Sequence, residues 1–533
     1  MKGDFARVTF DPARHYSRVM QQQGRVTLEA DWNEQAGIQL FLLRTMIADL
    51  VGPCWAPGDG FAITTEQHVA DWQLAPGHFY VDGILCQNEA MCTLDAQPYA
   101  PAPTDTGGDW NKPPNSFALW LDVWERHLSA LEAPQIADPA LNGVDTASRA
   151  QTVWQVRMLD LDPAPLTAAL DAVTAALKVR LQAAVSSADQ TAINQQISDV
   201  TQLRNNIAAG NLAINGDPCP SLRQVLGSRA AYAWPQLRAQ LGPIPSDSEP
   251  CVIAADARYR GCENQLYRVE IHQGGAAGTA GSPSGTNFKW SRENGSVIFP
   301  ILRADSTAQN DGSAQLAVSL ATLGRDQRLG LAVNDWVELV DDNYTLAQQA
   351  APLLQVMAID TAQMMVTLLV PKNVTPYTVS NDPARHPLLR RWDQSVGVDG
   401  QGCVPLLEGQ TIELEDGVQV SFQAGGLYAN GDYWLIPARV AGNGTLDWPQ
   451  APDGTAQAVF SSGMHHQAVL GCLDVQGEYN ECCCRFDSLC ALIMKDADRR
   501  ATNKLDVQPM AVAKPAAKKA AAATKAAPKK KGT

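Results

Sequence analysis

The chain has 533 residues, of which 45% are hydrophobic and 18% charged, and its formal net charge is −15. This composition excludes a wholly disordered chain, and at about 150 residues per domain the length predicts three or four modules. The acidic balance argues against a nucleic-acid-binding body. The first residues lack an apolar signal core, and Arg44 and Asp49 interrupt the apolar stretch 40–51, so we expect no membrane span and a cytoplasmic protein.

Residues 1–60 are predicted to form an N-terminal arm followed by an amphipathic helix. The arm, up to residue 35, mixes arginine and aromatic side chains at no regular spacing, which is typical of an extended segment that lies over a surface. The candidate interface residues are Phe5, Phe10, Tyr16, Arg18, Arg25 and Trp32. The surface beneath them is either the chain's own body or a neighbouring subunit, and the pattern favours a contribution to assembly.

The helix is predicted from apolar residues that recur every three or four positions between Gly24 and Leu50, before Gly52 and Pro53 end the pattern. This spacing makes one apolar stripe, which consists of Trp32, Ala36, Leu40, Leu43, Ile47 and Leu50. The helix either packs this stripe on its own domain or presents it to a partner.

Residues 61–160 are predicted to form a β module. The segment 117–124 is almost wholly apolar, so we expect a strand that is buried on both sides, and a second strand is expected at 152–157.

Residues 161–250 are predicted to be an inserted helical hairpin with a connector. Apolar residues with helical spacing occupy 166–181 and again 193–207, and Gly210 ends the second run. Ser186 to Asp189 lie between the runs and supply side chains that cap a helix N-terminus.

Residues 251–372 are predicted to form a β-sandwich-like module, followed by a linker at 373–400. In one predicted strand the apolar side chains of Tyr267, Val269 and Ile271 alternate with the polar side chains of Arg268, Glu270 and His272. This alternation predicts a half-buried antiparallel strand whose polar face is solvated. The pair Asn294-Gly295 predicts a hairpin turn, and 336–340 a further strand.

Residues 401–495 are predicted to form a further β module, with a hairpin turn at Asp416-Gly417 and a strand at 432–437. Residues 496–533 are predicted to be a disordered cationic tail. Its last 26 residues carry seven lysines and no acidic residue, so the remainder of the chain carries −22, and the tail could contact an anionic surface. The predicted fold class is therefore α+β, mainly β: several antiparallel β-sandwich or barrel-like modules with an N-terminal helix and an inserted helical hairpin.

The twelve cysteines are diluted in a long chain without a signal peptide, which favours free thiols over disulfides. The cluster of Cys482, Cys483, Cys484 and Cys490 follows His465 and His466. Neighbouring residues on a strand point to opposite faces, so this cluster is not expected to hold a metal. We predict that the fold needs no metal, cofactor or disulfide.

Catalytic motifs are missing from the sequence. Glu263, Glu270 and Glu293 are the candidates for an acid/base pair of the kind that cleaves glycosides, but no nucleophile, base or metal set accompanies them. We therefore predict that the protein is not an enzyme and assign no catalytic residue. Tyr433 and Trp434, if exposed, would instead suit contact with a glycan.

Several blocks of the sequence resemble one uncharacterised domain family, which is often encoded beside the sheath, baseplate and spike genes of contractile injection systems and phage-like tails. The blocks are 1–5, 10–12, 15–19, 22–26, 31–35, 121–126, 138–141, 145–149, 153–156, 259–261, 263–272, 288–297 and 431–439. The resemblance implies a structural or accessory component of such a particle, with baseplate, spike or tail subunits as partners and self-association as a further option. It also implies release together with the particle. The alternatives are a glycan- or cell-surface-binding module and a particle cargo.

Overall fold

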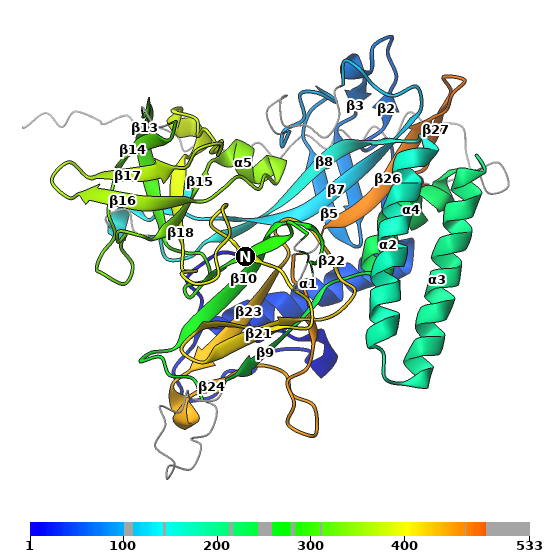
Figure 1. Ribbon diagram of the computed structural model, residues 1–533. Coiled ribbons are helices and arrows are strands. Elements are labelled where there is room, and N and C mark those ends of the chain that lie inside the picture. Colours follow the sequence, from blue (N-terminus) through cyan, green and yellow to red (C-terminus); the bar gives the residue numbers. More distant parts are fainter. Residues whose placement is uncertain are drawn as a thin grey trace, which may run out of the picture. The chain divides into compact units, whose positions relative to one another are not determined.

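A computed structural model describes residues 1–100, 110–141, 145–212, 217–242, 258–278, 282, 284–309, 312–463 and 465–486 (Figure 1). Residues 1–485 form one compact unit, and all the structure below belongs to it except Phe486, the last residue of the final strand. Strands predominate over helices, and a closed barrel accompanies several antiparallel sheets, which confirms the predicted fold class. The predicted lysine-rich tail lies outside the described residues.

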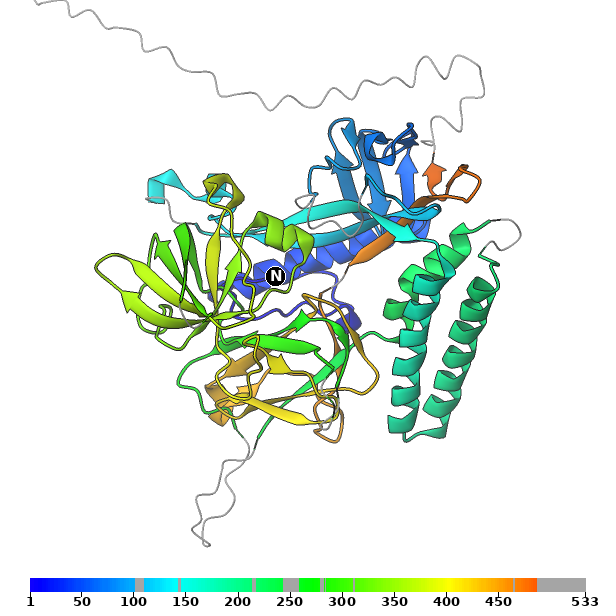
Figure 2. The same cartoon turned by 45° about the horizontal axis from the view of Figure 1, so that its top comes forward.

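The predicted N-terminal helix and the predicted helical hairpin are both present. The α-helices of the described residues are α1 (Glu29–Val51), α2 (Pro163–Ala183), α3 (Ser187–Ala208), α4 (Cys219–Tyr232) and α5 (Asp342–Ala347). Helix α1 ends at Gly52, whose backbone NH donates to the carbonyl of Ala48. In the hairpin, Asp162 caps α2 and Ser186 caps α3, as the sequence predicts for the second cap. The two helices stand side by side (Figure 2), and α4 packs against α2.

The predicted strands at 117–124 and 152–157 belong to two long antiparallel strands that pair along their whole length. They are β7 (Phe117–Leu128) and β8 (Arg149–Asp160). The first half of β7 is buried on both faces, as predicted. Around them lie β1 (Cys54–Pro57), β2 (Ile63–Thr64), β3 (Gln73–Leu74), β4 (Gly77–Val81), β5 (Ile84–Asn88), β6 (Cys92–Thr93), β26 (His466–Leu473), β27 (Tyr479–Glu481) and β28 (Cys484–Phe486).

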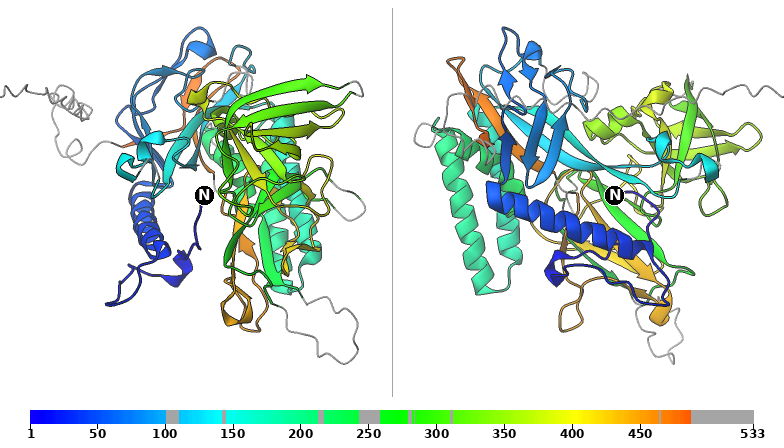
Figure 3. Two further views of the ribbon diagram at one scale, coloured as in Figure 1. Left: turned by 90° about the vertical axis from the view of Figure 1, so that its left-hand side faces the viewer. Right: turned by 180° about the vertical axis from the view of Figure 1, so that it is seen from behind.

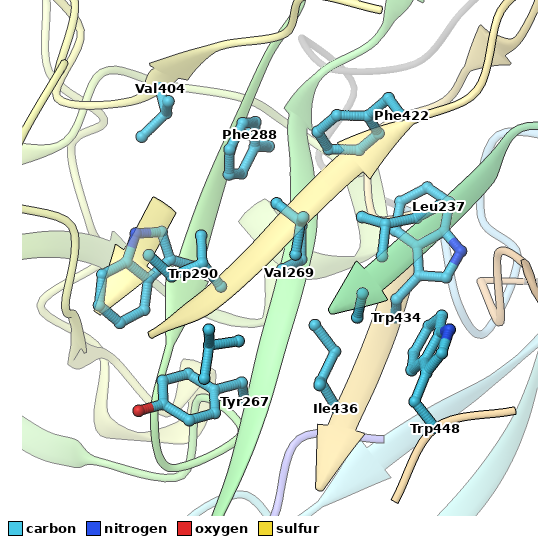
Figure 4. Close-up of a cluster of buried hydrophobic side chains, with 14 of the residues drawn as sticks. Leu237, Tyr267, Val269, Phe288, Trp290, Val404, Phe422, Trp434, Ile436 and Trp448 are labelled. Atoms are coloured by element: carbon cyan, nitrogen blue, oxygen red, sulfur yellow. The ribbon is translucent and has the colours of Figure 1, made fainter. Parts of the chain in front are cut away.

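A five-stranded sheet and a four-stranded sheet enclose the aromatic core that Figure 4 shows. The first has the order β19 (Val404–Pro405), β12 (Asn287–Ser291), β10 (Gln265–Gln273), β23 (Tyr433–Arg439) and β24 (Thr445–Leu446). The second has the order β20 (Thr411–Glu415), β21 (Val418–Phe422), β9 (Gln236–Leu241) and β25 (Val459–Phe460). A short pair joins β11 (Gly275–Ala276) and β22 (Leu427–Tyr428).

Six strands close into a barrel that has its own apolar core. Around the barrel they are β13 (Ile298–Ala308), β14 (Ala314–Leu320), β17 (Met365–Val370), β16 (Leu354–Asp360), β15 (Trp336–Val340) and β18 (Leu388–Trp392). Strand β18 lies inside the predicted linker 373–400, so that part of the prediction is wrong. The five residues of β18 are all buried, and without them the barrel would not close.

The two predicted hairpin turns differ in outcome. Asp416 and Gly417 both have positive φ and connect the paired strands β20 and β21, as predicted. Asn294 and Gly295 also have positive φ, but they do not make a hairpin. The strand before them, β12, belongs to the five-stranded sheet, whereas the strand after them, β13, belongs to the barrel. A local turn signal fixes the turn and not the partners of its flanking strands.

The sheets do not follow the predicted division into 61–160, 251–372 and 401–495. Within the described residues, strands of the last segment join five sheets that begin earlier in the chain. For example, β26 pairs with β7, β21 with β9 and β23 with β10. These long-range pairings interlock the segments, because each of these sheets is complete only when residues beyond 400 have joined it.

Candidate functional site

The apolar stripe of α1 faces solvent. Trp32 is 66% exposed, Leu43 50% and Leu50 77%, and Leu40 and Ala36 are exposed as well, while Ile47 is half-buried. We call these six residues the outer stripe. In the right-hand view of Figure 3, α1 runs across the near side of the molecule, and no other helix or strand of the described ranges passes in front of it. Within the described residues most of the stripe is uncovered, which favours presentation to a partner over packing on the chain's own domain.

The opposite side of α1 explains this orientation. Ala30 and Ile38 are buried there, and Gly37 lies against the ring of Phe10. The turn between β4 and β5 approaches so closely that a Cβ on Gly83 would lie 2.2 Å from the carbonyl oxygen of Arg44. Because small residues permit this close approach, the helix turns its small side inward and leaves its large apolar side outward.

The six predicted interface residues do not lie on one surface. Phe5 and Phe10 are half-buried on the chain's own body, where Phe5 meets the ring of His127 and Phe10 meets that of Phe41. The other four, Tyr16, Arg18, Arg25 and Trp32, are exposed. The arm therefore splits into a docked segment, residues 1–11, and an exposed segment, residues 12–28.

The docked segment enters the space between the five-stranded sheet and the barrel. The side-chain amide of Asn294 donates to the carbonyl oxygens of Met1, at 3.1 Å, and Gly3, at 2.9 Å. The amino group of Met1 donates to Tyr433 Oη at 2.6 Å, and Lys2 forms an ion pair with Glu270 at 2.9 Å. The turn at Asn294 thus serves as the docking point of the arm.

A buried charge cluster lies where the arm enters, and consists of Lys2, Arg268, Glu270, Lys289, Glu338 and Arg390. The prediction that Arg268, Glu270 and His272 face solvent is wrong, because each is at most 3% exposed. The alternation along β10 is real, but the barrel and the arm cover the polar face. Alternation identifies the two faces of a strand and does not identify what covers them.

The two glutamates of the cluster are fully paired. Glu270 accepts from Arg268 Nε at 2.5 Å and contacts Lys2 and Lys289. Glu338 accepts from Lys289 and, at 2.9 Å each, from the Tyr344 hydroxyl and the Trp392 indole. Burial alone would raise the pKa of Glu338, but Lys289 and Lys2 bring it down to about 2.

The pKa of Glu270 is likewise held well below its usual value against the effect of burial, by Lys2 and Arg268. Both carboxylates therefore stay ionised, which suits a structural ion-pair network and not proton transfer at neutral pH.

The three glutamates considered for catalysis do not converge. Glu270 belongs to the buried charge cluster, whereas Glu263 and Glu293 both bind the guanidinium of Arg328. Burial raises the pKa of Glu293 to about 7, and the two hydrogen bonds that Arg328 donates to its carboxylate favour the ionised form. The shared arginine contacts one oxygen, Oε1, of each of these two carboxylates, which is the arrangement of a structural ion pair.

Neither candidate glycan residue is fully exposed. Trp434 is 1% exposed in the aromatic core (Figure 4), and its indole donates to the carbonyl of Val459 at 2.8 Å. Tyr433 is half-buried, with the Arg268 guanidinium 3.7 Å from its ring centre. Alternate residues of β23 face the core and the buried charge cluster, so Trp434 is enclosed in the core and Tyr433 lies against Arg268 of the cluster.

The expectation of free thiols only is wrong for one pair. Cys219 and Cys482 form a disulfide across 263 residues of sequence. Spacing along the chain cannot reveal such a pair, because the fold brings the two residues together. Within the part of the chain that the structure describes, no group of His, Cys, Asp or Glu is arranged to hold a metal ion. Cys490 lies outside the described residues.

Sequence reasoning missed Lys289, Glu338 and Arg390. Each is a charged residue in a short strand that is otherwise mostly apolar. Lys289 and Glu338 have apolar neighbours on both sides, in Phe288-Lys289-Trp290 and Val337-Glu338-Leu339, and Arg390 follows Leu389 and precedes Arg391. A charge in such a strand is a signal for a buried ion pair, since a strand with apolar neighbours on both sides is covered.

No helix in the described ranges combines the length and the apolar character that crossing a membrane requires. No curated protein matches the chain. One solved structure with some similarity is the crystal structure of TssK, at 10% sequence identity and a TM-score of 0.14, over 79% of this chain and 99% of that one. The model of a protein family of unknown function, DUF6519, matches residues 1–533. The chain therefore belongs to the DUF6519 family.

Proposed function

We propose that the protein is a non-enzymatic structural subunit of a phage-tail-like contractile injection particle, which binds a neighbouring subunit through the outer stripe of α1. It is assembled in the cytoplasm and leaves with the particle. The observation that carries the binding role is the solvent exposure of the outer stripe. The resemblance of the sequence blocks to a family encoded beside sheath, baseplate and spike genes supports the particle.

The outer stripe is too continuous for an ordinary surface. Single exposed apolar residues are common, but a contiguous row along a helix marks a contact with another molecule. Leu42 and Met46 border the stripe and are about half exposed as well. With them, the exposed apolar face is as wide as the face that a helix buries inside a bundle. Covering it would contribute on the order of 5 kcal/mol before the entropy lost on association is subtracted.

A protein partner suits the stripe better than a lipid surface does. Helices that lie on anionic membranes are rich in lysine and arginine on their polar side. Helix α1 has Glu29, Asp31, Glu34 and Asp49, and its one basic residue, Arg44, donates to Glu125 at 2.7 Å. The polar side of α1 is therefore acidic and would be repelled by anionic lipid.

The test is a pair of substitutions on the stripe, Leu43→Asp with Leu50→Asp. Both side chains point into solvent, so the variant should fold with an unchanged melting temperature but fail to enter particles. The matched control is Val185→Asp with Leu302→Asp, which places two charges on exposed apolar residues elsewhere. The control should be incorporated normally. Normal incorporation of the stripe variant would refute the proposed docking role.

A further inference from the structure

The disulfide joins two parts of the fold that are otherwise held only by non-covalent contacts. Cys219 is the first residue of α4, and Cys482 lies between β27 and β28. Both are 5% exposed. Helix α4 belongs to the helical unit α2–α4, whereas Cys482 follows the strand that pairs with β26. The bond therefore connects the helical unit to the sheet of β7 and β26.

Non-covalent contacts already bring the two sulfur atoms together. A small apolar cluster of Ala118, Leu222, Val469 and Cys472 surrounds them, and Arg223 donates to the carbonyl oxygen of Cys482 at 2.6 Å. The backbone NH of Cys482 donates to Leu470 O at 2.8 Å. These contacts would persist without the bond, so the reduced chain keeps its fold and the two thiols stay near each other.

We propose that Cys219 and Cys482 form a redox-dependent latch, which is open as two thiols in a reducing compartment and closes in oxidising surroundings to fix the helical unit on the sheet. The inference does not rest on the proposed particle role. A chain that is made in a reducing compartment and later exposed to oxidising surroundings would pass through both states.

The closing reaction needs only a small disulfide, such as oxidised glutathione, as the oxidant. The thiolate of Cys219 attacks one sulfur of that disulfide, forms a mixed disulfide and displaces one glutathione thiolate. The thiolate of Cys482 then attacks the Cys219 sulfur and displaces the second. Two protein thiols become one disulfide, and two electrons and two protons reduce the oxidant to two thiols.

Cys219 suits the role of the attacking thiol, because the N-terminus of a helix stabilises a thiolate. Two neighbouring buried thiols, Cys472 and Cys483, are poor competitors. Burial raises the pKa of Cys472 to about 11 and that of Cys483 to about 12, and Cys483 Sγ lies 3.3 Å from the carbonyl oxygen of Leu470. Neither forms a thiolate readily at neutral pH, so the surroundings favour pairing of Cys482 with Cys219.

The experiment treats the full-length protein with reduced or with oxidised glutathione, labels the remaining thiols and locates the labels by peptide mass spectrometry. Oxidation should remove two labelled thiols, Cys219 and Cys482, raise the melting temperature by a few degrees and slow hydrogen exchange in α4. Cys219→Ser should abolish the response, whereas Cys472→Ser, in the same apolar cluster, should retain it.

Three outcomes would overturn the latch. The first is that Cys219 and Cys482 remain open to labelling after oxidation. The second is that the cross-link maps to Cys483 or Cys484. The third is that hydrogen exchange in α4 is the same in both states, because a bond that does not restrain the helix is not a latch.

Discussion

Lys289 and Glu338 lie in different β-structures, β12 of the five-stranded sheet and β15 of the barrel, and their side chains form an ion pair that is almost wholly buried. Both charged groups are removed from water, which is costly, and this cost is offset only because each has ion-pair and hydrogen-bond partners. Glu338 gains the Tyr344 hydroxyl and the Trp392 indole, and Lys289 lies 3.5 Å from Glu270. The pair therefore fixes the barrel on the sheet.

Removing one member of this pair should be costly. Lys289→Met leaves Glu338 charged in a covered site, and we expect the free energy of unfolding to fall by about 3–5 kcal/mol in chemical denaturation. The control is Arg303→Met, which removes an exposed ion pair with Asp305 and should leave the unfolding midpoint almost unchanged. An equal effect of the two substitutions would contradict the role of the buried pair.

Acid should weaken the fold through His272. Burial, with a smaller contribution from Lys289, lowers the pKa of His272 to about 4, whereas an unfolded histidine titrates near 6.5. The unfolded state therefore binds this proton first as the pH falls, and the folded state loses about 1.4 kcal/mol per pH unit between pH 6.5 and 4.

The variant His272→Gln isolates this effect. Glutamine can keep a donor towards Ala351 O, which lies 2.8 Å from His272 Nε2, but it cannot take up the proton. The difference in unfolding free energy between the two proteins should change with that slope across the window. A difference that is independent of pH would mean that His272 titrates normally in the folded protein.

The docked segment of the arm should be released by a side chain at Gly3. A Cβ there would lie 2.7 Å from the Phe5 ring and 3.0 Å from His127 Nε2. In Gly3→Val, hydrogen exchange of residues 1–11 should accelerate, and the control Arg18→Met, on the exposed segment, should leave that exchange unchanged. If residues 1–11 exchange at the same rate in both variants, they are not held at Asn294.

Local features of the fold were predictable from the sequence, and long-range ones were not. The period of Leu166 to Ile207 predicts the helical hairpin, and the apolar run from Phe117 predicts a doubly buried strand, because each pattern depends on neighbours in the chain. The closure of the barrel by β18, the separate partners of the two strands that flank Asn294 and the Cys219–Cys482 bond depend on residues brought together by folding. No local pattern encodes them.

The residues of the candidate site were predictable from the sequence, but the side of the molecule that they face was not. The spacing of Trp32, Leu43 and Leu50 defines the stripe, yet only the close packing of Gly37 and Gly83 on the other side shows that it points outward. Conversely, Trp434 resembles an exposed ligand-binding ring in the sequence and is a core residue in the fold.

The proposed structural role makes this chain an integral subunit of a particle. Its most direct test is the copy number of the chain in purified intact particles, measured by mass spectrometry against isotope-labelled standard peptides and compared with a known ring-forming subunit. The structural role predicts a fixed, whole-number ratio that matches the symmetry of the particle and is the same in every preparation. A low ratio that varies between preparations would contradict it and would identify the chain as cargo.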